Sequence, residues 1–270
     1  MKVVIFCGGM GMRLRDYSDK IPKPLVEVGP QPILWHLMKY YAHYGHNEFI
    51  LCLGYGADAI KRYFLEYDEC RMNDFVYAEG GRSIELYDTD IEDWTITFVD
   101  TGRASNVGER LRRVQPFLGD DEEFLANYAD GLADLDLDAY VQSFRESGRI
   151  ARFLTVPAPH TFHNVRTDDD GQVVEIEHIS RTNVRVNAGF FAFRREIFDY
   201  MLPDEELVVE PFARLIEKGE LIAEPFDGYW QPMDTFKDKN LLDEIAGSGV
   251  APWQVWLQPE APAVAAPGDT

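Results

Sequence analysis

The sequence has little positive charge for its size. Lys and Arg together number 26 against 47 Asp and Glu, so the formal net charge of the 270-residue chain is −21. Binding to nucleic-acid backbones and to anionic membrane surfaces depends on Lys and Arg, and a chain this acidic repels such polyanions at long range. We therefore expect neither a nucleic acid nor a membrane among its partners.

Cysteine and long apolar runs are also scarce. The three cysteines are too few and too irregularly spaced for a disulfide framework or a zinc site. No segment approaches the roughly 20 apolar residues of a transmembrane helix. Residues 2–6 favour a strand over a signal peptide, because glycines follow at once. The expected compartment is the cytosol, and the 46% hydrophobic content is enough for a folded core.

Short apolar runs alternate with helical spacing over the first 150 residues. Strands are predicted at 2–6, 49–53, 75–78, 95–99 and 123–128, and helices at 32–45, 57–67, 109–117 and 137–147. This alternation predicts an α/β fold with βαβ crossovers, a parallel sheet, and ligands at the carboxyl ends of the strands.

The chain beyond residue 150 is richer in strands. Strands are predicted at 150–156, 161–166, 173–177, 185–193 and 221–225, and helices at 195–201, 208–218 and 236–246. The acidic run Asp168–Gly171 predicts a hairpin turn. The Pro- and Ala-rich tail, residues 258–270, is expected to be disordered.

A glycine-rich segment, G-G-M-G-M-R-L at residues 8–14, follows the first strand. Glycines let a backbone turn tightly and approach a phosphate, although a plain turn is an equal alternative. Residues 1–39 carry six basic side chains against three acidic ones, a local charge of +3 in an acidic chain. Lys23 lies between two prolines, which stiffen the backbone and reduce the entropy lost when the lysine holds a ligand. These features indicate a local anion site.

Three polar positions follow or interrupt predicted strands. Asp130, before a glycine, could hold Mg²⁺, which prefers oxygen ligands, or could form an Asp-Gly turn. Asp234, in W-Q-P-M-D-T, could be a second carboxylate or the N-cap of the next helix. Asn187 and Gly189, in N-A-G-F-F, suit close approach of a hydroxylated ligand or a β-bulge.

Taken together and in this order, the motifs resemble those of the sugar-1-phosphate nucleotidyltransferase family, and most closely its glucose-1-phosphate cytidylyltransferase branch. The resemblance covers roughly residues 1–257 and includes P-K-P-L-V-E-V-G, F-V-D-T-G, E-R-L-R-R-V and Y-W-Q-P-M-D-T. It implies one Rossmann-like domain, a mostly parallel sheet flanked by helices with a small β-rich sugar-binding part. The expected divisions are nucleotide binding at 1–150, sugar binding at 151–235, and a C-terminal helix and tail contact at 236–257.

The resemblance also implies roles for particular residues. Nucleotide-binding residues would be Gly8, Gly9, Gly11, Arg13, Gly108, Arg110 and Arg112. Arg13 and Lys23 would act on the reacting phosphates, and Asp130 and Asp234 would bind Mg²⁺. Sugar-binding residues would be Asn187, Gly189, Glu177, His178, Arg181, Arg185 and Trp230. The expected partners are a nucleoside triphosphate, CTP by resemblance with UTP, dTTP and ATP as alternatives, and a sugar 1-phosphate.

The sequence departs from the family pattern in the sugar half. Relatives have Glu-Lys-Pro in the strand before N-x-G, whereas residues 175–181 read E-I-E-H-I-S-R. A replacement cation could come from His178, Arg181 or Arg185, and the acceptor could be glucose 1-phosphate or a related sugar-like phosphate. A non-catalytic nucleotide-sugar-binding subunit is the alternative. Relatives are usually homo-oligomers, and residues 253–257 are expected to be exposed and available to a partner.

Overall fold

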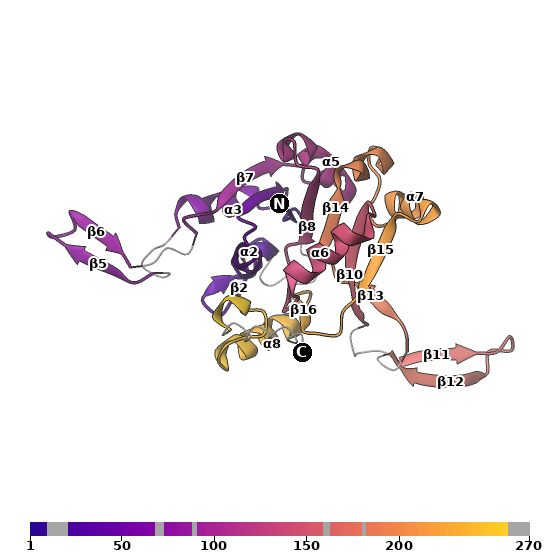
Figure 1. Ribbon diagram of the computed structural model, residues 1–270. Helices are drawn as coiled ribbons and strands as arrows, with labels where there is room; N and C mark the ends of the chain where they lie inside the picture. Colours follow the sequence, from indigo (N-terminus) through magenta and orange to yellow (C-terminus); the bar gives the residue numbers. More distant parts are fainter. Residues whose placement is uncertain (10–20, 68–72, 88–90, 159–162, 180–181, 259–270) are drawn as a thin grey trace, which may run out of the picture.

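The structure is a computed structural model that describes residues 1–9, 21–67, 73–87, 91–158, 163–179 and 182–258 (Figure 1). Its centre is a mixed sheet flanked by helices. The strands of this sheet, in the order in which they pair, are β7 (Thr95–Asp100), β4 (Glu48–Leu53), β1 (Val3–Phe6), β8 (Glu123–Tyr128), β14 (Phe191–Arg194) and β10 (Ala151–Pro157). The predicted α/β fold is confirmed.

The strands from the first half of the chain pair in parallel, as their alternation with helices predicts. β1 pairs in parallel with β4 and β8, and β4 with β7. The second half reverses direction, because β14 is antiparallel to both β8 and β10. β10 also pairs antiparallel with β13 (Arg185–Asn187) and in parallel with β15 (Leu221–Pro225). The carboxyl ends of β1, β4, β7 and β8 therefore meet at one edge of the sheet.

Alternate residues of β1 belong to two cores, one on each face of the sheet. Val3 and Ile5 pack in the core that includes side chains of α2 (Ile33–His43) and α6 (Leu137–Ser147). Val4 and Phe6 pack in the core that includes α5 (Val107–Val114) and α7 (Glu210–Lys218). A strand buried on both faces requires a continuous apolar run, and residues 2–6 supply such a run.

Two further helices, α3 (Ala57–Leu65) and α8 (Phe236–Gly247), contribute Ile60 and Leu242 to the first core. The segment after α8 returns to this core as well. Trp253 is fully buried, and its indole N–H donates to Nδ1 of His36 in α2 at 3.3 Å. The expectation that residues 253–257 are exposed is therefore wrong for Trp253, which the apolar face of α2 covers.

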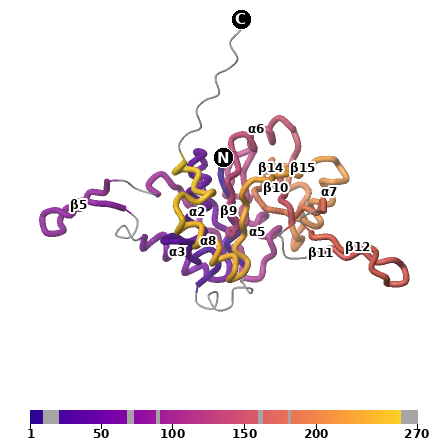
Figure 2. Tube along the Cα trace, turned by 90° about the horizontal axis from the view of Figure 1, so that it is seen from below, coloured from indigo at the N-terminus to yellow at the C-terminus, as the bar shows by residue number. Residues whose placement is uncertain are grey.

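Two hairpins project from the body on opposite sides, as Figures 1 and 2 show. One consists of β5 (Phe75–Ala78) and β6 (Ser83–Leu86), and the other of β11 (His163–Thr167) and β12 (Val173–His178). Asp168 starts the predicted turn, and its carboxylate accepts from the backbone N–H groups of residues 170 and 172. The 75–78 strand pairs only with its neighbour in the hairpin, so it forms no part of the central sheet.

Several elements differ from the sequence prediction for local reasons. Helix 109–117 ends early, and Pro116 then sits in the first turn of a separate 3-10 helix, η3 (Gln115–Leu118). Residues 195–200 form the 3-10 helix η5 (Arg195–Tyr200). Four further strands of two or three residues are absent from the sequence prediction, because they are too short for a periodic pattern: β2 (Glu27–Val28), β3 (Gln31–Pro32), β9 (Gly131–Ala133) and β16 (Trp230–Pro232). Within the described ranges, no helix combines the length and apolarity needed to cross a membrane.

Candidate active site

A two-stranded ladder brings together Asp130 and Asp234, which are far apart in the sequence. Asp130 lies between β8 and β9, and Asp234 follows β16. β9 and β16 pair antiparallel, with Gly131 opposite Pro232, and the N–H of Met233 donates to the carbonyl of Asp130 at 2.8 Å. The ladder therefore places two carboxylates next to each other at the carboxyl end of β8.

Lys23 lies between these two carboxylates. Its ammonium Nζ is 2.6 Å from Oδ2 of Asp130 and 2.8 Å from Oδ1 of Asp234. Lys23 begins the 3-10 helix η2 (Lys23–Leu25), and the preceding proline holds the backbone extended at the N-cap. The stiff segment predicted from the flanking prolines thus positions the lysine side chain, which is only 13% exposed.

The charge of Lys23 is stabilised in this setting. Burial by itself would lower the pKa of the ammonium, but Asp130 and Asp234 outweigh burial, so the pKa is raised from its usual value. The lysine is therefore positively charged at neutral pH. The alternative role of Asp234 as a helix cap is wrong, because Thr235 caps α8 and forms a reciprocal capping box with Asp238.

A cavity of about 280 Å³ opens beside this cluster. Five of the predicted site residues line it: Gly8, Gly9, Lys23, Arg110 and Asp130. Its wall also includes Tyr128, whose pKa burial raises to about 12, so that the phenol stays neutral. The cavity joins the end of the first strand to the Lys23 cluster. Gly11 and Arg13, predicted in the same loop, lie outside the described residues.

Arg110, in the wall of this cavity, connects the carboxyl ends of three strands. Its buried guanidinium donates to the carbonyl of Gly8 at 3.0 Å, to the carbonyl of Leu53 at 3.1 Å and to Oγ1 of Thr101 at 2.8 Å. A Cβ built on Gly8 would lie 2.0 Å from Nη1 of Arg110, and one on Gly54 would lie 2.8 Å from it. Glycine is therefore required at both positions for the arginine to fit.

Gly108 and Arg112, predicted to approach the nucleotide, are not among the described residues that line this cavity. A Cβ on Gly108 would lie 2.2 Å from the backbone carbonyl of Glu205. Arg112 donates to the carboxylate of Glu109, one turn earlier on α5, at 2.9 Å. The close approach of Glu205 favours packing of Gly108 against the segment before α7, whereas the ion pair of Arg112 lies within α5. Nucleotide contact by either residue stays a prediction.

The N-A-G-F-F motif interrupts a strand at the sugar half of the predicted site. Residues 185–193 form two strands because Gly189 (φ +78°) and Phe190 (φ +49°) are left-handed. The buried amide of Asn127 holds this break, with Oδ1 accepting from the N–H of Phe190 at 3.0 Å. A Cβ on Gly189 would lie 2.3 Å from the same oxygen. The glycine is thus explained by the close approach of Asn127.

Asn187 and Trp230 lie beside this break. The amide of Asn187 donates to the hydroxyl of Tyr128, which lines the cavity, at 3.3 Å. The indole of Trp230 donates to the carbonyl of Ala188 at 3.1 Å. Both side chains connect the β9–β16 ladder and β8 to the interrupted strand. Their contact with a sugar stays a prediction.

The three candidate replacement cations have different surroundings. Arg185 donates to Asp227 and to the carbonyls of Thr155 and Phe226, at 2.7 to 3.0 Å, so its guanidinium joins β13 to the chain after β15. His178 lies with Glu177 at the end of β12, where its ring meets that of His163 across the hairpin. Arg181 lies outside the described residues. The contacts of Arg185 thus favour a role in holding the fold together over a role as the replacement cation.

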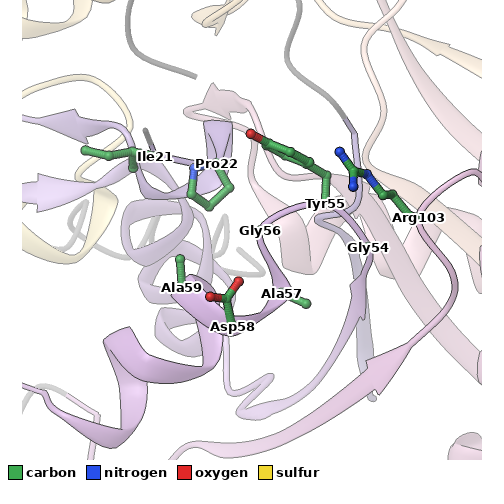
Figure 3. Close-up of a pocket in the computed structure, with 9 residues that line it drawn as sticks. All are labelled: Ile21, Pro22, Gly54, Tyr55, Gly56, Ala57, Asp58, Ala59 and Arg103. Atoms are coloured by element: carbon green, nitrogen blue, oxygen red, sulfur yellow. The ribbon is translucent and has the colours of Figure 1, made fainter. Parts of the chain in front are cut away.

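A second cavity, of about 510 Å³, lies at the carboxyl end of β4 (Figure 3). The guanidinium of Arg103 sits over the ring of Tyr55, 5.1 Å from its centroid, and both line the cavity. The residue before Lys23, Pro22, forms part of the opposite wall. An aromatic and cationic wall suits a planar or anionic group. Tyr55 follows β4 and Arg103 follows β7, so the parallel pairing of these strands brings the two side chains together. The sequence carries no strong motif at either position that would predict this contact.

The donor set at the Lys23 cluster fits a hard divalent cation in part. Asp130 and Asp234 supply carboxylate oxygens that converge on one position, since a single ammonium contacts both. In the described part of the chain, no group of three or more His, Cys, Asp or Glu side chains forms a metal site. Two carboxylates fill only part of the usual octahedral shell of Mg²⁺, so phosphates and water would complete it.

Comparisons with known proteins agree with this geometry. The model of a family described as nucleotidyl transferase matches residues 2–243. The chain belongs to the nucleotidyl transferase family. It is 38% identical over 260 residues to a glucose-1-phosphate cytidylyltransferase of Salmonella typhi, covering 95% of this chain and 100% of that protein. The Salmonella typhimurium enzyme of the same name is also 38% identical, over 262 residues. The resemblance inferred from the motifs is confirmed.

Two solved structures show the same fold. A UTP-bound UGPase of Acinetobacter baumannii superposes with a TM-score of 0.66 at 16% identity, covering 91% of this chain and 93% of that one. HddC of Yersinia pseudotuberculosis gives a TM-score of 0.63 at 19% identity, with 90% and 98% covered. The chain is thus a sugar-1-phosphate nucleotidyltransferase similar to the glucose-1-phosphate cytidylyltransferases. Membership of an enzyme family favours catalysis over the alternative of a non-catalytic binding subunit.

Proposed function

We propose that this nucleotidyltransferase transfers a nucleotidyl group from CTP to glucose 1-phosphate or a related sugar-like phosphate, with Mg²⁺ as cofactor. The products are an NDP-sugar and pyrophosphate. The observation that carries the proposal is the convergence of Lys23, Asp130 and Asp234 beside a cavity that the glycine-rich strand end also lines. The similarity to two cytidylyltransferases over nearly the whole chain supports the choice of nucleotide and sugar.

The reaction needs charge stabilisation more than proton transfer. A phosphate oxygen of the sugar phosphate attacks the α-phosphorus, and the bond from that phosphorus to the bridging oxygen of pyrophosphate breaks. The nucleophile is already an anion, so no general base is required. When bound, Mg²⁺ supplies positive charge to the triphosphate and the leaving group. The main barrier that the protein lowers is the repulsion between two anions that must meet in line.

The chain's own groups match these requirements. Lys23 provides a positive charge on a stiff backbone at the cavity wall. Asp130 and Asp234 would hold the metal ion, and the end of β1 at Gly8 and Gly9 gives the triphosphate a backbone to approach. The residues of the sugar half, with Asn187 and Trp230 near the strand break, would contact the acceptor. We also propose a homo-oligomer, from the resemblance alone, and a location in the cytosol, from the scarcity of cysteine and of long apolar runs in the sequence.

A pyrophosphate-release assay tests the proposal. Purified protein is incubated with Mg²⁺, one of CTP, UTP, dTTP or ATP, and a panel of sugar 1-phosphates. We expect the highest turnover with CTP and glucose 1-phosphate or a close analogue. Absence of pyrophosphate release across the whole panel, with nucleotide binding intact by calorimetry, would refute a catalytic role on these substrates.

Asp130→Asn tests the metal site directly. We expect turnover to fall by at least 10²-fold, since removing one charge-stabilising group from an active site typically costs about this much. Asp138→Asn is the matched control, because Asp138 is an exposed carboxylate of α6. Turnover of the Asp130 variant within threefold of the control would show that Asp130 is not a ligand.

A further inference from the structure

Lys23 occupies the position where the two carboxylates converge. Its ammonium contacts one oxygen of Asp130 at 2.6 Å and one of Asp234 at 2.8 Å, and these distances are those of charge-assisted hydrogen bonds. The lysine side chain is 13% exposed, against 31% and 42% for the two aspartates. The chain's own cation is thus the most buried member of the cluster, and the carboxylates face it.

A divalent cation and the ammonium of Lys23 compete for these carboxylates. Two positive charges beside the same pair of carboxylates repel each other, and an oxygen that accepts from the ammonium is a weaker ligand for a metal ion. Conversely, the phosphates of a nucleotide give the ammonium another anionic partner. Departure of the lysine, arrival of phosphates and binding of a metal ion are therefore linked equilibria.

We propose that Lys23 is an internal counter-ion, which holds the carboxylates of Asp130 and Asp234 closed to divalent cations until the phosphates of a nucleotide draw the ammonium away. This inference rests on the proposed function, since it assigns the order in which the ligands of that site bind. It gives Lys23 two successive partners. In the nucleotide-free protein the lysine offsets one of the two negative charges of the aspartates, and in the loaded protein it contacts the reacting phosphates.

The surroundings of the cluster support a site that is weak for metal on its own. Within the residues that the structure describes, only these two carboxylates converge there and no third His, Cys, Asp or Glu ligand joins them. The lysine lies on a 3-10 helix that begins after Pro22 and contains Pro24, so the backbone stays in place while the four-carbon side chain moves. Lys23 can thus exchange partners through movement of its side chain, without movement of its backbone.

Binding of Mn²⁺ without nucleotide or sugar phosphate tests the proposal. Free Mn²⁺ is measured by electron paramagnetic resonance in titrations of the wild type, Lys23→Met and Lys61→Met. Methionine removes the charge and keeps the length of the side chain, and Lys61 is an exposed lysine of α3 that serves as control. We expect Lys23→Met to bind Mn²⁺ at least fivefold more tightly than both other proteins.

A double variant shows where the gained affinity resides. Lys23→Met combined with Asp130→Asn should lose the gain, because one of the two carboxylates is then neutral. A gain below fivefold in Lys23→Met, or a gain that persists in the double variant, would overturn the proposal. Circular dichroism of each variant confirms that the fold is intact.

The outcome is separable from that of the proposed function. The titration contains no substrate, whereas the pyrophosphate assay of the wild type measures catalysis. A fivefold gain together with a catalytically silent wild type would refute the function and keep the internal counter-ion. A wild type that releases pyrophosphate, together with no gain, would refute only the counter-ion.

Discussion

Replacing Arg110 by methionine tests whether the strand ends at the active site are held by one buried side chain. The guanidinium is 4% exposed and donates to Gly8, Leu53 and Thr101, at the ends of β1, β4 and β7. Methionine keeps an apolar side chain of similar length and removes all three hydrogen bonds. The carbonyl of Leu53 keeps two other donors, the N–H and the hydroxyl of Thr101. The largest loss therefore falls on Gly8.

Two opposing effects set the size of the loss. Three hydrogen bonds from a charged donor contribute about 1.5 kcal/mol or more each. Against this, methionine avoids the cost of burying a guanidinium, and burial is indeed the main cause that lowers the pKa of Arg110. We expect the loss of the hydrogen bonds to be the larger effect, so the free energy of unfolding should fall by about 2–3 kcal/mol. This lowers the melting temperature by roughly 4–12 °C in a chain of this size.

Urea unfolding and steady-state kinetics measure the two consequences. Arg112→Met is the matched control in the same helix. Among the described residues Arg112 forms an ion pair with Glu109, and its loss should cost about 0.5 kcal/mol or less. Because the carbonyl of Gly8 loses its donor, the KM for the nucleoside triphosphate should rise more than that for the sugar phosphate. A stability loss below about 1 kcal/mol, or equal losses in the two variants, would refute the reasoning.

Two further changes probe packing and pH. Gly108→Ala places a Cβ 2.2 Å from the carbonyl of Glu205 and should lower the free energy of unfolding in urea by about 1–3 kcal/mol. Gly9→Ala is the control, because no described atom lies within 4 Å of its Cβ, and equal losses in the two variants would contradict the packing role of Gly108. Burial lowers the pKa of His36 to about 4, from a value of 6.5 in the unfolded chain. As the pH falls from 6.5 to 4, the imidazole is protonated in the unfolded state but not in the folded state, so the free energy of unfolding falls by about 3 kcal/mol. Urea midpoints across this range should fall less steeply in His36→Gln, and an unchanged slope would show that His36 is not the group responsible.

The parallel half of the fold could be predicted because β1, β4 and β8 are buried along nearly their whole length. Residues 123–128 and 137–147 become β8 and α6 with the predicted bounds. The apolar runs and the Gly and Pro boundaries determine these elements locally. The interrupted strand at Gly189 could not be predicted in this way, because the break depends on the amide of Asn127, a residue of another strand.

The candidate site shows the same division between local and distant causes. The stiff backbone at Lys23 and the position of Asp130 at a strand end follow from their neighbours in the sequence. The role of Arg110 does not, because its three acceptors come from three strands. In the sequence, an arginine among other arginines gives no sign of burial. Asn127 was also missed, although a polar residue inside the apolar run E-F-L-A-N-Y is the signal that could have revealed it.

The ladder of β9 and β16 has a consequence for the growing chain on the ribosome. Asp130 is synthesised long before Asp234, and the backbone bond between Met233 and Asp130 cannot form until the later segment has emerged. Helix α2 likewise lacks one contact until late in synthesis, because the hydrogen bond from Trp253 to His36 needs the C-terminal segment. A nascent chain that has completed all four parallel strands thus still has half of its carboxylate pair and an uncovered helix. The complete carboxylate pair therefore arises at the end of synthesis, together with the last contacts between the two halves of the chain.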